Sequence, residues 1–165
     1  MEQSHTLMFA PVVTRKLEVF PVLMDIIISL KQYIDMNLIE IISRNQFLKQ
    51  LYPDGLSDFF IGQIELSSFD RISIVLHCKQ RPNITVSKWG IWGKDYNVIT
   101  IELLGTMINK LNVLDWQKNN EESCQYIIKE SNDYYQIDFF GKEWRFEIEL
   151  KSLIFQRNTT YIITQ

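Results

Sequence analysis

The stretch RPNITVSKWGIWGKDYNVITIELLGTMINKLNVLDW (residues 81–116) decides the fold that the sequence predicts. It holds three of the four tryptophans, three of the six glycines and the two clearest strand patterns, residues 98–104 and 109–116. In the first pattern Ile99, Ile101 and Leu103 alternate with polar residues, as in a strand with one buried face. Gly105 interrupts the alternation before the second pattern, so we predict two separate strands here.

Alternating patterns extend outward from this stretch in both directions. Residues 71–78 alternate before it, and residues 143–150 do so most regularly, with Trp144, Phe146 and Ile148 set against charged neighbours. We predict further strands at residues 84–92, 124–129, 134–140 and 155–163, with turns at Gly93-Lys94-Asp95, Gly141-Lys142 and Arg157-Asn158. Residues 56–69 show no clear period and are predicted to be a connecting segment.

A different period precedes the strands. Between residues 22 and 51 apolar side chains recur at steps of three and four, which predicts a helix that could break near Asn37 or Asn45. Tyr52-Pro53-Asp54-Gly55 ends it, because proline cannot continue a helix and Asp-Gly favours a turn. Residues 12–19 fit either an edge strand or an extended arm. The predicted fold is therefore α+β: an N-terminal helix packed on a mainly antiparallel β-sheet, a meander of about seven strands.

Composition predicts one soluble domain. The 165 residues are 46% hydrophobic and 22% charged, with a net charge of −3, so residues 1–55 (arm and helix) and 56–165 (sheet) are expected to share one core. This charge disfavours nucleic acid as a partner. Four charged residues interrupt the apolar run 20–42, and no signal peptide pattern precedes it, so we expect no membrane association and a cytoplasmic location.

Residues able to carry chemistry are scarce. Neither Cys78 nor Cys124 has the spacing of a zinc ligand, and both are expected to be small buried hydrophobes. Of the two histidines, His77 has no sequence neighbour that would activate it. No nucleotide-binding, hydrolase or zinc-peptidase motif occurs, so we predict no enzymatic activity, no metal and no cofactor. The acidic residues near Glu147 fit the solvated face of a strand better than a glycosidase pair.

Charge is concentrated in one part of the chain. Residues 1–114 are neutral, whereas residues 115–149 hold nine acidic and four basic side chains, a net −5. Such a region can steer a basic partner, and aromatic side chains beside turns are common anchors. The predicted partner-binding residues are Trp92, Tyr96, Asp115, Glu121, Glu122, Glu130 and Asp133. The alternatives are core packing for the aromatic residues and ion pairing of the carboxylates with Lys142, Arg145 and Lys151.

The order of these features resembles a family of bacterial immunity proteins, the family numbered fifty among the antidotes of polymorphic toxin systems. The resemblance covers residues 45–160. The matching elements are the strand at residues 71–78, Pro82-Asn83-Ile84-Thr85-Val86-Ser87-Lys88-Trp89, Asn97-Val98-Ile99-Thr100-Ile101-Glu102-Leu103 and residues 111–116.

The resemblance implies a cytoplasmic, non-enzymatic protein, monomeric or weakly dimeric, that binds and neutralises a cognate toxin protein. The acidic stretch described above predicts that this toxin is basic. Two other classes stay open: a chaperone for secreted effectors, and a small-ligand or glycan-binding module that uses the tryptophans.

Overall fold

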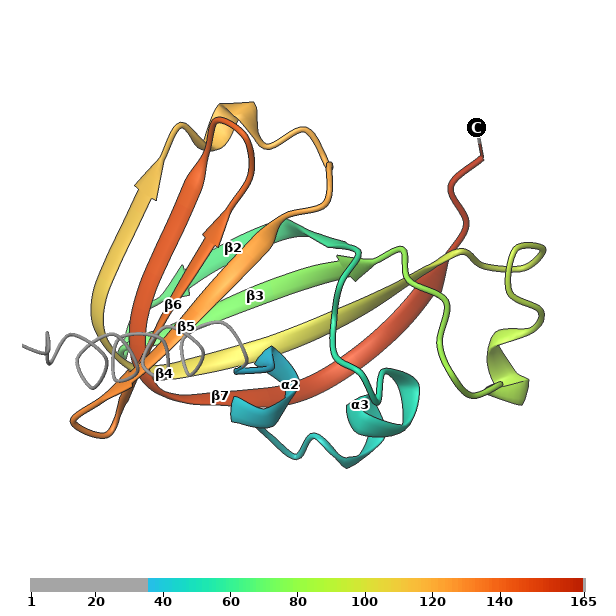
Figure 1. Cartoon of the computed structure of the whole chain (residues 1–165), viewed down its shortest axis with the longest axis horizontal. Coiled ribbons are helices and arrows are strands. Elements are labelled where there is room, and N and C mark those ends of the chain that lie inside the picture. Colours follow the sequence, from blue (N-terminus) through green and yellow to red (C-terminus); the bar gives the residue numbers. More distant parts are fainter. Residues whose placement is uncertain (1–35, 165) are drawn as a thin grey trace, which may run out of the picture.

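The computed structural model describes residues 36–164, which form short helices on a mostly antiparallel open sheet (Figure 1). The sheet order is β2-β3-β4-β7-β6-β5, and β1 pairs with β7 outside this path. Two three-stranded meanders, β2-β3-β4 and β5-β6-β7, are thus joined where β4 pairs with β7. The prediction of an α+β chain with a mainly antiparallel sheet is confirmed, although a single meander is not what forms. The strand bounds are β1 Ile42–Ser43, β2 Phe59–Ser67, β3 Arg71–Cys78, β4 Val98–Leu114, β5 Gln125–Ser131, β6 Tyr134–Phe140 and β7 Arg145–Tyr161.

The predicted helix lies only partly within the described residues, and there it is broken. Helix α2 (Leu38–Ile41) and helix α3 (Gln46–Leu51) flank β1. The side chain of Asn37 accepts from Ile39 N at 2.9 Å and caps α2, while Asn45 Nδ2 donates to Ile39 O at 2.7 Å at its other end. Within the described residues the helical pattern is therefore interrupted between Ile41 and Gln46, beside Asn45, one of the two positions predicted for a break. The predicted helical residues 22–35 and the extended residues 12–19 lie outside the described part.

The segment 56–69, predicted as a connection, contains strand β2. Gly62 conceals the alternation because the register with β3 shifts between Ile61 and Gln63. Residues on both sides of the sheet are also buried at its start, where Phe59, Phe60 and Ile61 are at most 2% exposed. A strand with this pattern shows no period of two in the sequence.

The prediction of a strand at residues 84–92 is wrong. These residues belong to a long loop with a 3-10 helix at Ser87–Trp89. Gly90 and Gly93 have φ angles of +83° and +82°, which other residues rarely adopt, so the chain turns at both positions.

In two places, a pair of strands that was predicted as separate forms one long strand, β4 in the first place and β7 in the second. Strand β4 runs through Gly105, where a side chain would meet Ile72 Cγ2 at 2.6 Å. Glycine is therefore required by packing and does not end the strand. The bend comes two residues later, at Met107, whose φ is +54°. Strand β7 likewise runs through Arg157 and Asn158, which form no turn.

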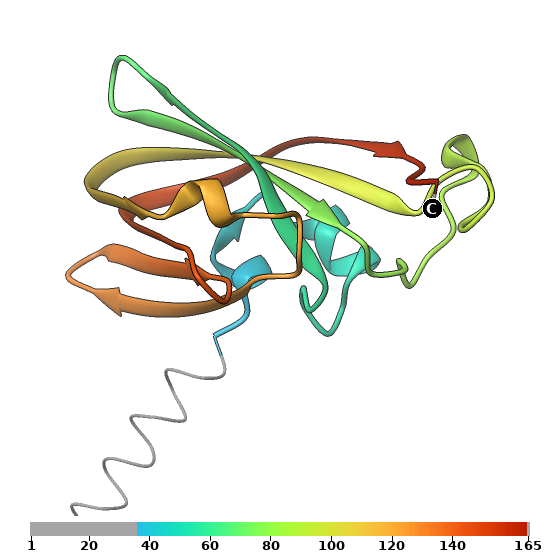
Figure 2. The ribbon, with the colours of Figure 1, turned by 90° about the horizontal axis from the view of Figure 1, so that it is seen from above.

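The sheet curves so that its two ends enclose the core (Figure 2). Phe59 of β2 lies 5.9 Å from the Tyr126 ring of β5 and 6.4 Å from the Phe139 ring of β6. Helices α2 and α3 add Leu38 and Leu48, both fully buried, to the same cluster. The core is thus shared by helices and both meanders, which fixes the positions of the loops between strands.

Candidate interaction surface

The connection between β4 and β5, residues 115–124, is fastened to the edge of β2. Cys124 N donates to Phe59 O at 2.9 Å, and Asn119 Nδ2 donates to Ile61 O at 2.8 Å. Lys79 Nζ donates to Glu121 O at 2.7 Å. The first two bonds satisfy edge carbonyls of β2 that would otherwise lack partners, and all three fasten the connection to the β2-β3 hairpin.

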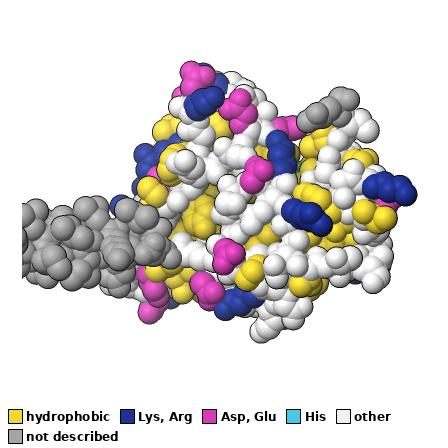
Figure 3. Space-filling view, turned by 45° about the vertical axis from the view of Figure 1, so that its right-hand side comes forward, with side chains coloured by type: hydrophobic (Ala, Val, Ile, Leu, Met, Phe, Trp, Pro, Cys, Tyr) yellow, Lys and Arg dark blue, Asp and Glu magenta, His cyan; other side chains and the backbone are white. Residues whose placement is uncertain are grey.

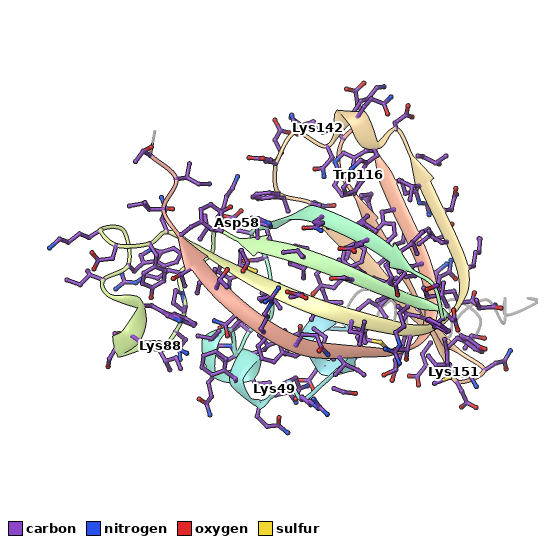
Figure 4. All side chains as sticks on the ribbon, turned by 180° about the vertical axis from the view of Figure 1, so that it is seen from behind. Lys49, Asp58, Lys88, Trp116, Lys142 and Lys151 are labelled. Atoms are coloured by element: carbon purple, nitrogen blue, oxygen red, sulfur yellow. The ribbon has the colours of Figure 1, made fainter. Side chains whose placement is uncertain are left out.

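The turn between β6 and β7 packs against this connection. Trp144 is 5% exposed, and its ring lies edge-on to Trp116 at 5.4 Å between centroids. Gly141 is required beneath the indole because a Cβ there would collide with the ring. Gly141 N also donates to Trp144 O at 3.1 Å. The two loops therefore form one rigid unit, which Figure 4 shows around Trp116 and Lys142.

A cleft lies on each side of this turn. One has a volume of about 440 Å³ and is lined by Lys118, Glu122, Gln125, Lys142, Glu143 and Trp144. The other, of about 510 Å³, is lined by Leu114, Asp115, Ile127, Asp138, Phe140 and Arg145, among others. Both clefts mix apolar walls with charged rims, as a surface that recognises a polar partner does.

Much of the negative charge in this part of the chain is paired. Arg145 binds both carboxylate oxygens of Asp138, at 2.6 and 2.5 Å, and this hydrogen bonding raises the pKa of the guanidinium. Glu147, only 9% exposed, accepts from Lys110 at 3.1 Å and from Gln136 at 2.6 Å. The bond from Lys110 is the main cause of its lowered pKa. These carboxylates form a structural network on the sheet surface and are not free for a partner.

The rim of the first cleft is less tightly paired. Lys142 and Glu122 are 3.7 Å apart, and Lys118 and Glu143 are 3.4 Å apart, both on exposed side chains. Such pairs contribute little to stability and can exchange partners. Within residues 36–164 Glu121 forms no salt bridge, and its φ of +60° is one that glutamate seldom adopts.

The structure does not bring all the predicted partner-binding residues together. Asp115, Glu121 and Glu122 lie at the loop pair just described. Glu130 and Asp133 lie at the turn between β5 and β6, at the far end of those strands (Figure 1). Trp92 and Tyr96 belong to the loop between β3 and β4, on the opposite side of the molecule. Tyr96 is 2% exposed, so it supports its neighbours and offers no surface of its own.

A cluster on the outer face of the sheet was not anticipated. His77 Nδ1 and Tyr161 Oη are 2.7 Å apart, and the imidazole stacks on Phe60 at 4.8 Å. Burial lowers the pKa of His77, which favours the neutral ring. Gly62 leaves no room for a side chain beside it. The contacts join residues up to 84 positions apart, so no local pattern could have indicated them.

Sulfur and metal chemistry find little support in the described residues. Cys78 and Cys124 are free and buried, and burial raises the pKa of Cys124 to about 12 and that of Cys78 further. Between residues 36 and 164 no group of His, Cys, Asp or Glu is arranged to hold a metal ion.

Comparison with known protein families, curated proteins and solved structures finds no match for this chain. None of the helices in the described part has the length and hydrophobicity needed to cross a membrane.

Proposed function

We propose that the chain is a non-enzymatic binding protein that captures and neutralises a basic toxin domain, as a bacterial immunity protein does. The observation that carries this proposal is the rigid unit formed by residues 115–124 and 140–144, with a cleft on each side and acidic residues on its rim. Because its loops are already held by hydrogen bonds and by the edge-on contact of the two indoles, little conformational entropy would be lost on binding.

The charge around this unit favours a basic partner. Residues 115–124 and 140–144 hold four acidic and two basic side chains, a net charge of −2, and Glu121 forms no salt bridge within the described residues. Exposed charges of one sign accelerate the encounter with a partner of the other sign, and added salt weakens this effect. The role of neutralising a toxin comes from the family resemblance, and the unit supplies the surface for it.

The test begins with the intact chain as bait in its native host, followed by identification of the captured protein by mass spectrometry. Association of the purified pair is then measured for Glu121→Lys combined with Glu122→Lys. We expect association several-fold slower than for the unaltered chain and less dependent on salt. The control reverses Asp54 and Glu65, which are exposed, lie outside this unit and change the net charge equally.

The control separates local contact from overall charge. Equal slowing by both double variants would mean that only the net charge matters, and unchanged kinetics would place the interface elsewhere. A captured protein whose toxicity the chain does not suppress would also contradict the proposal. If the partner is bound as an extended segment, the chaperone alternative replaces it.

A further inference from the structure

The loop between β3 and β4 differs in charge from the acidic connection at residues 115–124. Its residues 81–94 include Arg81, Lys88 and Lys94 and no acidic side chain. All three cations are exposed, and between the last two lies Ile91, which is 61% exposed. In Figure 3 hydrophobic side chains gather on the right, the side toward which this loop points, with basic side chains among them. This loop is therefore basic and apolar.

Hydrogen bonds within the loop fix its shape. Asp95 Oδ2 accepts from Ile91 N at 2.7 Å, and Gly93 N donates to Tyr96 O at 2.7 Å. Gly90 has φ +83° and ψ −147°, a conformation that is essentially restricted to glycine, and it lies directly against Asp95. Asp95 is exposed, but its carboxylate is oriented by the Ile91 amide. With Asp95 included, residues 81–95 keep a net charge of +2.

A cluster of aromatic side chains lies beneath the exposed residues of the loop. Tyr96 is buried and contacts Trp89 at 5.8 Å and Trp92 at 5.2 Å, both edge-on. Trp89 also meets Phe47 of α3 at 5.8 Å. The indoles are half-buried, so part of each ring is accessible while the rest is held in place. Rigid aromatic side chains of this kind are frequent anchors in binding surfaces.

The end of the chain extends the apolar surface. Asn97 donates to Ile163 O at 2.9 Å and accepts from Ile163 N at 2.7 Å, which fastens the last residues beside the loop. Ile162 and Ile163 are 42% and 37% exposed. Three exposed isoleucines therefore lie at the same end of the molecule as three exposed cations.

We infer that residues 81–94, together with Ile162 and Ile163, form a second binding surface, which takes an acidic protein segment that carries apolar side chains. The cations provide charge complementarity, and the isoleucines with the accessible parts of the indoles provide apolar contacts. A lipid surface fits less well, because Ile91 is the one strongly exposed isoleucine of the surface, while Trp89 and Trp92 are half-buried against Tyr96. This inference does not depend on the proposed function, which concerns another end of the molecule and a partner of opposite charge.

The test uses the intact chain, isotope-labelled for NMR, and three probes. These are a short synthetic peptide alternating Glu and Leu, the corresponding Lys and Leu peptide, and vesicles containing phosphatidylserine. We expect the acidic peptide to shift the amide signals of Lys88, Ile91, Lys94 and Ile163. Lys88→Glu combined with Lys94→Glu should weaken its binding about tenfold, which corresponds to about 1.4 kcal/mol. The matched control, Arg71→Glu with Lys151→Glu, changes the net charge equally at other sites and should leave that affinity unchanged.

Several results would overturn the inference. These are an absence of shifts at residues 81–94, equal weakening by the control pair, or binding of the vesicles without binding of the acidic peptide. Lys88 and Lys94 are exposed, so their substitution should leave the core intact, and a dispersed spectrum of the variant checks this. The Lys and Leu peptide reports separately on residues 115–145, so failure at one surface is distinguishable from failure at the other.

Discussion

The connection 115–124 and the loop 79–97 both link strands of one sheet, yet they are held in different ways. The first is anchored from outside, through bonds from Cys124 and Asn119 to the edge of β2 and through the packing of Trp116 on Trp144. The second is fastened to the rest of the molecule near its ends, for example by Asn83 N donating to Leu51 O, while its middle is held mainly from inside, through Asp95 and the aromatic cluster around Tyr96. A loop held by the sheet edge shares the stability of the core, whereas a loop held by its own contacts can open separately.

The two regions also differ in charge, and this separation has a consequence for binding. Residues 115–149 carry a net −5, while residues 81–94 carry three basic side chains and no acidic one. In Figure 4 Lys88 lies at one end of the molecule and Lys142 at another. A basic and an acidic partner could therefore bind the same chain without competing for one surface.

The largest expected effect is on the externally anchored region. Trp144→Ala removes a ring that is 5% exposed and packed on Trp116, so we expect a loss of about 3–5 kcal/mol in the free energy of unfolding. Urea denaturation followed by circular dichroism measures it. Because this region shares the core, the loss should appear in the single global transition. A separate early transition confined to residues 115–145 would contradict the comparison.

A smaller and more local effect is expected in the other loop. Gly90→Ala forces a side chain into a glycine-only conformation against Asp95, at a cost of about 1–3 kcal/mol. Amide hydrogen exchange should show faster exchange in residues 81–97 and little change in the β5-β6-β7 meander. Gly93→Ala is the matched comparison, since its φ is also positive but its surroundings are open. Uniformly faster exchange across the sheet would show that the loop is not autonomous.

The hydrogen bond from Lys79 to Glu121 lies near His77, and the dependence of stability on pH tests the packing around this histidine. The lowered pKa of folded His77 lies below its unfolded value of about 6.5, so the unfolded state takes up the proton first. The contribution of His77 to stability should be constant above about pH 6.5, fall as pH drops from there to the folded pKa, and level off below it. The same titration on His77→Gln should lack this part of the slope. An unchanged slope in that variant would assign it to other groups.

The smallest effect concerns the exposed pair of Glu122 and Lys142, whose side chains are 56% and 86% exposed. Glu122→Gln should change the free energy of unfolding by less than about 0.5 kcal/mol, because water and salt screen such pairs. Chemical denaturation at low and high salt measures this. A larger loss would mean that the acidic rim stabilises the fold and is less available to a partner.

Much of the sheet was predictable because side-chain alternation is a local property. Residues 71–78 and 134–140 form strands with the predicted bounds. In β3 the buried residues alternate as predicted and include Ile72, Ile74 and Leu76. Strand β2 was missed because a bulge at Gly62 broke its period. Residues 84–92 were misassigned because β-branched residues there resemble a strand, whereas two glycines with positive φ decide the conformation.

The candidate surfaces were only partly predictable. The excess of acidic residues after position 114 is visible in the sequence, as is the cluster of aromatic residues near Tyr96. The prediction that the acidic residues and these aromatic residues form one surface was wrong. Contacts between residues that are distant in the chain decide which loops lie next to each other. Trp116 meets Trp144, for example, across the whole β5-β6 hairpin.

The sequence by itself determined most of the antiparallel strands, the break of the N-terminal helical pattern near Asn45, and the sign of charge along the chain. Each depends on neighbouring residues, through backbone preference, capping or charge. Only the tertiary structure decided that β4 pairs with β7, that Gly105 lies within a strand and that the two charged regions face different ways. These three features arise because one open, curved sheet packs around a shared core. In such a core, packing decides which residues meet, whatever their separation in the chain.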